Sequence, residues 1–147
     1  MSKSLCFAAV ILAAAAMPAF ADDECGPAPV GPAISAASDL TGKTVEAGRA
    51  EVLDAYHQVK AYQAALKPFR ACLGRLDDAD IAAIAAAKAN GAKAKDKIPP
   101  LEDRIAARLK INNQSVDAEQ QVVTDFNNLH TAQCVNDTDP KICPKKP

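Results

Sequence analysis

A seven-residue repeat between residues 45 and 76 constrains the fold of this chain more than any other feature. Small or apolar residues return at every seventh position in two columns. The columns are Val45, Val52, Val59, Leu66 and Leu73, and Gly48, Ala55, Tyr62, Phe69 and Leu76. This spacing places both columns on one narrow stripe of a helix, the seam that coiled-coil helices bury against a partner. The repeat therefore predicts a long helix that packs lengthwise against other helices.

Local signals predict where this first helix begins and ends. Thr44 is a suitable N-cap, because its side-chain oxygen can accept a hydrogen bond from the first turn. Pro68 removes one backbone hydrogen bond, so a bend or a frayed last turn is expected. We expect the helix to end at about Leu73 or Leu76, with Gly74 as the stop.

Two further helices follow in the sequence. Asp77 can cap a short, alanine-rich second helix that ends at Asn90-Gly91, a pair typical of helix C-caps. Pro100 suits the first position of a third helix, which reaches about Cys134. The apolar stripe expected to face the core is Leu101, Ile105, Leu109, Val116, Val123, Phe126 and Leu129.

The first and third helices have matched lengths of about 45 to 50 Å at the rise of an α-helix. They predict an all-α fold, a long antiparallel helical hairpin of coiled-coil type with the short helix near its tip. An up-down-up three-helix bundle is the alternative. No segment shows the alternation of apolar and polar residues that a half-buried strand requires.

The first 21 residues are expected to be a cleaved signal peptide. Lys3 supplies the positive start, residues 5–16 the apolar core, and Ala19-Phe20-Ala21 a cleavage site of small residues before Asp22. The apolar run is too short to span a bilayer as an anchor. Because the signal is alanine-rich, as in bacteria, we expect the mature chain in the periplasm or outside the cell.

The mature chain has the size of one domain. A lead-in over residues 22–43 is predicted to be extended, because prolines fix φ and remove hydrogen-bond donors. The helical domain covers residues 44–136, and a tail of residues 137–147 is either disordered or tied by a disulfide. The prolines of the lead-in are Pro27, Pro29 and Pro32.

Four cysteines remain after cleavage: Cys25, Cys72, Cys134 and Cys143. An even number in an exported chain indicates disulfides. The extended lead-in reaches about 60 Å, whereas the helix from residue 44 to residue 72 covers about 42 Å, so Cys25 can return to Cys72. Cys134 would then close a short loop with Cys143. Pairing of Cys72 with Cys134 is the alternative, and it suits the three-helix bundle.

Composition excludes some partners. Without residues 1–21 the net charge is −2, which lacks the basic face that nucleic-acid binding needs. The four mature aromatics do not cluster in a loop, so they form no stacking platform. Four lysines, Lys88, Lys93, Lys95 and Lys97, could contact anionic lipid. A solvated helix tip accounts for them better, and membrane contact is not expected.

Signals for catalysis or cofactor binding are weak. The serines lack the glycines of a nucleophile elbow, and the carboxylates are explained as helix starts. His130 and Cys134 share a helix face and could ligate zinc, but an oxidising compartment favours a disulfide at the cysteine. His57 falls at a solvent-facing position. We therefore expect no catalytic residue, metal or cofactor, and no enzyme activity.

A cysteine soon after the signal and a proline-rich lead-in are followed by Val59-Lys60-x-Tyr62 and Cys72-Leu73. The pattern continues at Asn113, Val116-Asp117, Val123 and Phe126-Asn127. In these features the chain resembles a group of small uncharacterised exported α-helical proteins of proteobacteria. The resemblance covers most of the mature chain and omits the Cys134 and Cys143 tail. The group has no established activity, so the resemblance implies export and a Cys25–Cys72 bond only.

The sequence therefore predicts an exported, disulfide-stapled helical module with an interaction or structural role. The expected partner is a second copy, another envelope protein or a client that exposes apolar surface. A periplasmic protein that binds a small ligand or a metal is the alternative. The core positions named for the helix seam are Val45, Val52, Val59, Tyr62, Leu66, Phe69 and Leu73.

Overall fold

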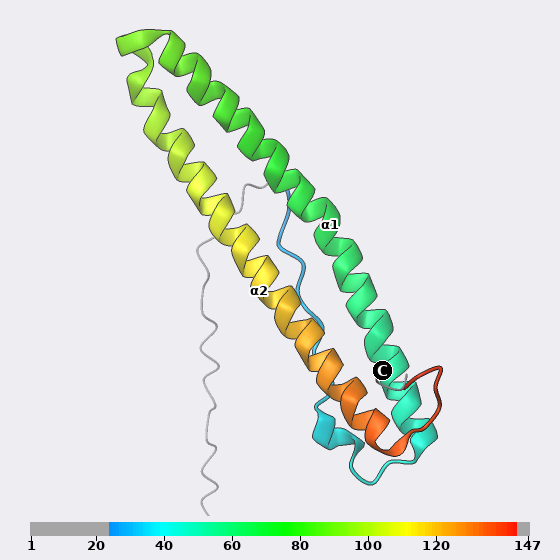
Figure 1. Cartoon of the computed structure of the whole chain (residues 1–147). Coiled ribbons are helices and arrows are strands. Elements are labelled where there is room, and N and C mark those ends of the chain that lie inside the picture. The colour runs from blue at the N-terminus through cyan, green and yellow to red at the C-terminus, as the bar shows by residue number, and fades with distance from the viewer. Residues whose placement is uncertain (1–23, 144–147) are drawn as a thin grey trace, which may run out of the picture.

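A computed structural model of the chain describes residues 24–143, apart from the side chains of Ala92 and Lys93. The described part is a helical hairpin with four elements, and it contains no strand (Figure 1). These are the 3₁₀ helix η1 (Ala37–Leu40), α1 (Val45–Ala89), the 3₁₀ helix η2 (Gly91–Lys97) and α2 (Ile98–Asn136). The hairpin prediction is confirmed, and the three-helix bundle is not formed. The expected signal peptide, residues 1–21, lies outside the described residues.

The first long helix, α1, does not stop at Gly74, and Asp77 does not begin a second helix, so both predictions are wrong. The seam continues without a break through the buried positions Leu73, Asp80 and Ala87. Packing on both sides of Gly74 outweighs the cost of about 1 kcal/mol for glycine inside a helix. Asp77 accepts a hydrogen bond from Arg108 instead of capping a turn. Pro68 lies inside α1.

The predicted start of the first helix and the predicted end of the second are the two ends of α1 in the structure. Thr44 accepts a hydrogen bond from the backbone of Ala47 at 3.2 Å, as an N-cap does. At the other end, Asn90 follows the last helical residue and Gly91 has a φ of +70°. This left-handed conformation, which glycine adopts without strain, turns the chain into η2. The element at the tip is therefore a 3₁₀ turn rather than a separate α-helix.

The return helix α2 begins two residues before Pro100 and ends two after Cys134. Its buried face differs from the predicted stripe, because Leu109 is 55% exposed and Val116 is 44% exposed. The residues of α2 that are buried are Arg108, Ser115, Val122, Leu129 and Gln133. Polar residues occupy seam positions in this helix, so a stripe drawn through apolar residues alone points to the wrong face there.

The two apolar clusters of the core lie in the half of the hairpin formed by the start of α1 and the end of α2, which we call the base half. There Val59, Tyr62 and Leu66 of α1 pack against Val122, and a second cluster joins Val52 and Ala55 to Leu129. We define the base half as residues 45–72 of α1 with 115–136 of α2. The tip half is residues 73–114, which include η2.

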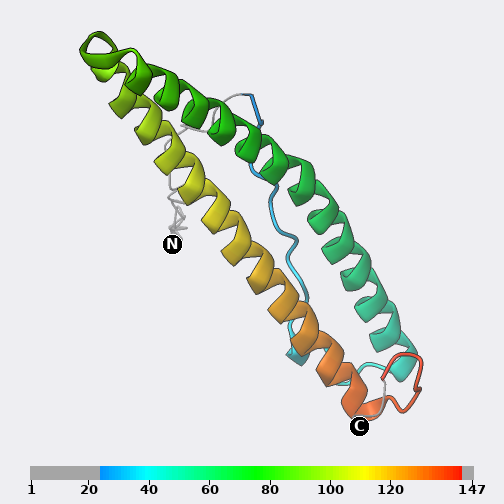
Figure 2. The same cartoon turned by 45° about the horizontal axis from the view of Figure 1, so that its top comes forward.

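A third layer covers part of this core. Residues 25–36 form neither helix nor strand and run along the two helices as a strap (Figure 2). Ile34 of the strap packs against both apolar clusters. Gly31 lies so close to the helices that a Cβ there would approach Val122 Cγ2 to 2.9 Å. A disulfide between Cys25 and Cys72 ties the start of the strap to α1.

Candidate functional site

The seam of α1 is flanked by two further columns with the same seven-residue spacing. In a heptad such flanking positions lie on opposite sides of the seam. The clasp column is Arg49, Tyr56, Gln63, Arg70 and Asp77, and its members contact α2 or its C-cap. The strap column is Glu51, Gln58, Ala65, Cys72, Ala79 and Ala86. One side of the hairpin is thus joined by side-chain contacts and the other by the strap.

At the base, Arg49 and Asp137 form a two-pronged ion pair. Arg49 Nε and Nη2 donate to the two carboxylate oxygens of Asp137 at 2.5 and 2.6 Å. Asp137 is 3% exposed and also accepts from the backbone of Asp139 at 3.0 Å. The hydrogen bond from Arg49 holds the pKa of Asp137 well below its usual range and raises the pKa of Arg49. This pair ties the end of α2 to the start of α1.

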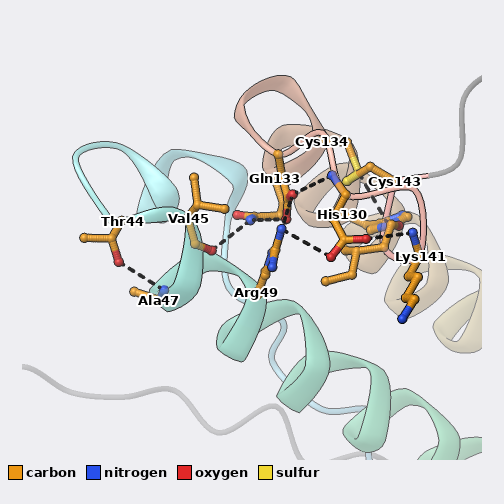
Figure 3. A network of polar contacts seen from close by, with 12 residues as sticks. Thr44, Val45, Ala47, Arg49, His130, Gln133, Cys134, Lys141 and Cys143 are labelled. Atoms are coloured by element: carbon orange, nitrogen blue, oxygen red, sulfur yellow. Dashed lines mark hydrogen bonds and ion pairs between the residues drawn. A yellow bond between two sulfur atoms is a disulfide. The ribbon is translucent and has the colours of Figure 1, made fainter.

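Gln133 completes the base cluster (Figure 3). Its amide nitrogen donates to the backbone oxygen of Val45 at 3.0 Å and to Asp137 Oδ2 at 3.2 Å. A Cβ on Gly48 would overlap the amide oxygen of Gln133. Glycine at this seam position therefore lets the two helices approach closely enough for the amide to reach the α1 backbone.

His130, Cys134 and Cys143 lie together at the same end, with ligand atoms within 4.8 Å of one another (Figure 3). The two sulfur atoms are bonded to each other. They are not thiolates, which are the form of cysteine that binds a metal. His130 is then the one remaining ligand of the three, so the structure does not support the predicted metal alternative at His130 and Cys134.

The middle of the hairpin is joined by a second polar cluster. Arg70 donates to Glu119 at 2.7 Å and to the hydroxyl of Ser115 at 2.9 Å. Gln63 donates to the other carboxylate oxygen of Glu119 at 3.0 Å. The hydrogen bond from Arg70 lowers the pKa of Glu119. Ser115 also donates to the backbone of Asn112, so this buried hydroxyl is used in structural hydrogen bonds.

The seam of the tip half contains charged residues as well as the buried Leu73, Ile84 and Ala87. Arg108 is 2% exposed and donates to Asp77 at 2.6 Å and to Asp80. Arg104 donates to both oxygens of Asp80 at 2.5 and 3.1 Å. The hydrogen bond from Arg104, helped by Arg108, lowers the pKa of Asp80 to about 2. A buried ion-pair layer thus lies between apolar seam residues in the tip half, where the base half has apolar clusters.

The strap side of the hairpin contains two open cavities of about 600 Å³ each. One lies beside the strap at the base, between residues 34–37 and the α2 residues Asp125, Asn128, Thr131 and Ala132. Near it, hydrogen bonds from Lys43 and Ser35 lower the pKa of Glu51. The second lies near the tip and is lined by Ala83, Ala86 and Ala87 of α1 and by Pro100, Leu101 and Arg104 of α2.

The two cavities lie on the same side of the hairpin. Ala86 is two heptads beyond Cys72, and Arg104 is three heptads before Asp125, so each stays on the same side of its helix. The strap begins at Cys25, which is bonded to Cys72, and runs toward the base (Figure 2). The alanine-lined cavity lies farther toward the tip and begins at Ala83. We call this side of the hairpin, with both cavities, the groove.

The residues that the sequence predicts for the seam, the disulfides and the outer face lie as follows in the structure. Of the seven named seam positions, Val45 is partly exposed and the other six are buried. The cysteines pair as Cys25 with Cys72 and Cys134 with Cys143, the pairs expected for the hairpin. His57 is exposed on the outer face of α1. The Cys134–Cys143 bond holds the described part of the tail, residues 137–143, against the end of α2.

The clasp column was missed by the sequence reasoning, which followed apolar residues. Its signal was present, because Arg49, Gln63, Arg70 and Asp77 keep the seven-residue spacing one position after the Gly48 column. Polar residues at such flanking positions commonly make ion pairs between helices. Which residue of α2 each would meet depended on the register of the hairpin.

None of the helices in residues 24–143 is both long and apolar enough to cross a membrane. Comparison with known proteins gives no relative, since no family model, no curated protein and no solved structure matches the chain. The disulfides and the groove are therefore the features from which a function can be argued.

Proposed function

We propose that this chain is an exported, non-catalytic module that binds an extended segment of another protein in the groove between its helices. The two disulfides fit an oxidising compartment, where such bonds persist. The signal-like residues 1–21 support export to the periplasm. The resemblance to exported helical proteins of proteobacteria agrees with this location.

The observation that carries the proposal is the half-covered groove. Its base half holds the strap, a proline-containing segment that packs through Gly31 and Ile34. On the same side, the tip half presents the cavity lined by alanines. It extends along α1 from Ala83 to Asn90, about 10 Å at the rise of an α-helix, which leaves room for about three extended residues. The strap itself shows the kind of polypeptide that this groove accepts.

Charge specifies the partner further. Residues 88–97 carry four lysines and one aspartate, a net charge of +3. A partner that follows the direction of the strap would place its N-terminal end beside these residues. The preferred ligand is therefore an acidic stretch followed by an extended, proline-containing apolar segment. Complementary charge would speed the encounter and make it sensitive to salt.

A defined peptide tests this binding mode. The probe is a fluorescent peptide with the sequence of residues 22–34 and serine in place of Cys25, which is acidic first and proline-rich afterwards. It should bind the mature protein saturably, and a peptide of residues 26–34 should bind more weakly. The difference between the two peptides should shrink at high salt.

Two matched variants locate the site. Ala86→Trp fills the groove, whereas Ala85→Trp adds the same side chain to the adjacent outward position, and both alanines are exposed. Ala86→Trp should weaken binding at least about tenfold and Ala85→Trp should not. Equal effects, or no saturable binding, would contradict the groove proposal. A stable dimer in native mass spectrometry would assign the surface to a second copy instead.

Export is tested separately. N-terminal sequencing of the mature protein from a periplasmic extract should begin at Asp22. Alkylation without reduction should modify none of the four mature cysteines. An uncleaved chain in the cytoplasm, or one free thiol, would contradict the proposed location without bearing on peptide binding.

A further inference from the structure

The two disulfides have different surroundings. Cys134–Cys143 closes a sequence separation of nine residues at the end of α2, and both cysteines are partly exposed. Cys25–Cys72 spans 47 residues. Outside that bond, Cys72 Sγ lies 3.9 Å from the backbone oxygen of Glu24, which has no hydrogen to donate. The base disulfide instead lies beside a histidine.

The position of the proton on His130 follows from its contacts. His130 Nε2 lies 2.7 Å from the backbone oxygen of Ile142. Because a carbonyl only accepts, Nε2 must carry the hydrogen. The same nitrogen is 3.6 Å from Cys134 Sγ. The ring stacks on Phe126 with 6.0 Å between centroids and 4° between planes, which fixes its direction. In the oxidised protein the one hydrogen of Nε2 is therefore donated to Ile142, and Cys134 Sγ lies next to the same nitrogen. When the bond opens and the tail carrying Ile142 moves away, this N–H is free to donate to the Cys134 thiolate.

We propose that Cys134, Cys143 and His130 form a thiol–disulfide exchange site for a dithiol in the same compartment. A sulfur leaves more readily when its thiolate is stabilised, and a hydrogen bond to the charged form does this. The His130 N–H makes Cys134 the leaving sulfur. Cys143 is therefore the sulfur that an incoming thiolate attacks.

The exchange proceeds in two balanced steps. The thiolate of the dithiol bonds to Cys143 Sγ while the Cys134–Cys143 bond breaks, and its electron pair goes to Cys134. His130 hydrogen-bonds to that thiolate until it takes up a proton from solvent. The second thiol of the partner, deprotonated, attacks its own sulfur in the mixed disulfide and expels Cys143, which is also protonated. The partner is oxidised to a disulfide and the protein gains two electrons and two protons.

The fold can survive this reduction. Asp137, between the two cysteines, remains held by Arg49 and by Gln133. The apolar core and the Cys25–Cys72 bond lie elsewhere on the hairpin. Asp139 also stays held, by Arg49 at 3.5 Å and by its backbone N–H on Asp137. Reduction would release the tail after Asp139 without opening the helices. The site can therefore be reduced while the hairpin stays folded, independently of any ligand in the strap groove.

Limited reduction of the full mature protein tests the proposal. Unreduced protein is treated with limiting dithiothreitol, quenched with an alkylating reagent at successive times and mapped by mass spectrometry. Cys134 and Cys143 should be labelled before Cys25 and Cys72. Simultaneous labelling of all four cysteines, or earlier labelling of Cys25 and Cys72, would overturn the assignment.

The direction in which a His130 substitution changes the reduction rate distinguishes a chemical role from a packing role. His130→Ala should slow reduction of Cys134–Cys143 by about tenfold, because the leaving thiolate loses its donor. If His130 only packs the tail, its removal loosens the loop and reduction becomes faster or stays unchanged. His57→Ala is the matched control, since this exposed histidine contacts Tyr56 at the surface. Circular dichroism on each variant checks that the helices are intact.

A monothiol identifies the attacked sulfur. Brief treatment with glutathione followed by acid quenching should leave the mixed disulfide on Cys143 and a free thiol on Cys134. In His130→Ala this preference should fall toward equal labelling of the two sulfurs. A mixed disulfide mainly on Cys134 in the parent protein would overturn the proposed direction.

Discussion

The base half and the tip half of the hairpin share one heptad geometry but fill its seam with different chemistry. In the base half, seam positions hold Val59, Leu66 and Leu129, and the polar seam residues Ser115 and Gln133 are neutral. Ion pairs there use the clasp column beside the seam. In the tip half, Asp80 and Arg108 occupy the seam itself. Buried apolar area stabilises directly, whereas a buried ion pair roughly offsets its own desolvation.

The strap and the disulfides widen this difference. Both disulfides lie at Cys72 or on its base side. The strap runs from there toward the base of the hairpin (Figure 1). The tip half has alanines along the strap column and receives no strap. Regions with few apolar contacts open locally at lower free energy than the core. The base end therefore holds the hairpin together, whereas the tip end exposes an alanine-lined surface that the strap does not cover.

The largest expected effect comes from removing the strap disulfide. Replacing Cys25 and Cys72 together by serine should lower the free energy of unfolding by about 4 kcal/mol, from the entropy of a loop of this length. Replacing Cys134 and Cys143 should cost about 3 kcal/mol, because their loop is shorter. Urea unfolding measures both. A larger loss from the second pair would place the main anchor in the tail instead of the strap.

The second prediction tests the packing of the two helices. Leu66→Ala should destabilise by about 3 kcal/mol, because Leu66 is 1% exposed in the apolar cluster. Leu109→Ala, in the tip half of α2, should change stability by less than about 0.5 kcal/mol. Thermal melts of the two variants and of the His57→Ala surface control check this. Similar losses for Leu66 and Leu109 would mean that α2 buries another face.

The hairpin architecture could be predicted from the sequence because the heptad repeat, the helix caps and the cysteine positions all favoured it. The heptad from Val45 predicted a helix that packs lengthwise, and Thr44 marked its start. Asn90-Gly91, predicted as the end of a second helix, is where α1 ends. Chain reach favoured Cys25 with Cys72. The sequence prediction ended the helix at Gly74 because it considered only the low helix propensity of glycine. It overlooked that the polar residue Asp80 continues the seven-residue repeat of the seam.

The partly wrong stripe of α2 has the same physical origin. Arg108 and Ser115 are buried because partners on α1 satisfy them, and those partners are known only once the helices are paired. The candidate groove likewise required the hairpin, since its walls come from residues on both helices that lie far apart in the chain. The site at His130 could be seen as an i,i+4 pair, but the direction of its N–H depends on the tail.

The third prediction uses two glycines of α1. Gly48→Ala should destabilise by about 2 kcal/mol, because the added Cβ overlaps the buried Gln133 amide and displaces its hydrogen bonds. Gly74→Ala should stabilise by up to about 1 kcal/mol, because the residue is exposed and no other side chain or element lies within 4 Å of the added methyl group. Unfolding curves measure both signs. An increase in stability from both substitutions would show that the two helices pack less closely at Gly48.

The smallest effect concerns acid and the tip half. The pKa of Asp80 is lowered to about 2 by the hydrogen bond from Arg104, with help from Arg108. A group with a depressed folded pKa contributes stability above its unfolded pKa, near 3.8, and loses it as pH falls toward 2. Solvent screening at this narrow hairpin limits the contribution to about 1 kcal/mol.

Asp80→Asn should therefore shrink the loss of stability between pH 5 and pH 2.5 by about 1 kcal/mol, measured as the shift of the urea midpoint. Asp78→Asn, on the exposed face of the same turn, is the matched control and should leave the pH dependence unchanged. Because Asp137 at the base also has a lowered pKa, acid weakens both halves, and only the part that Asp80→Asn removes belongs to the tip. An unchanged pH dependence in this variant would mean that the ion-pair layer contributes nothing to holding the tip closed, and that the alanine packing around Ala87 does so alone.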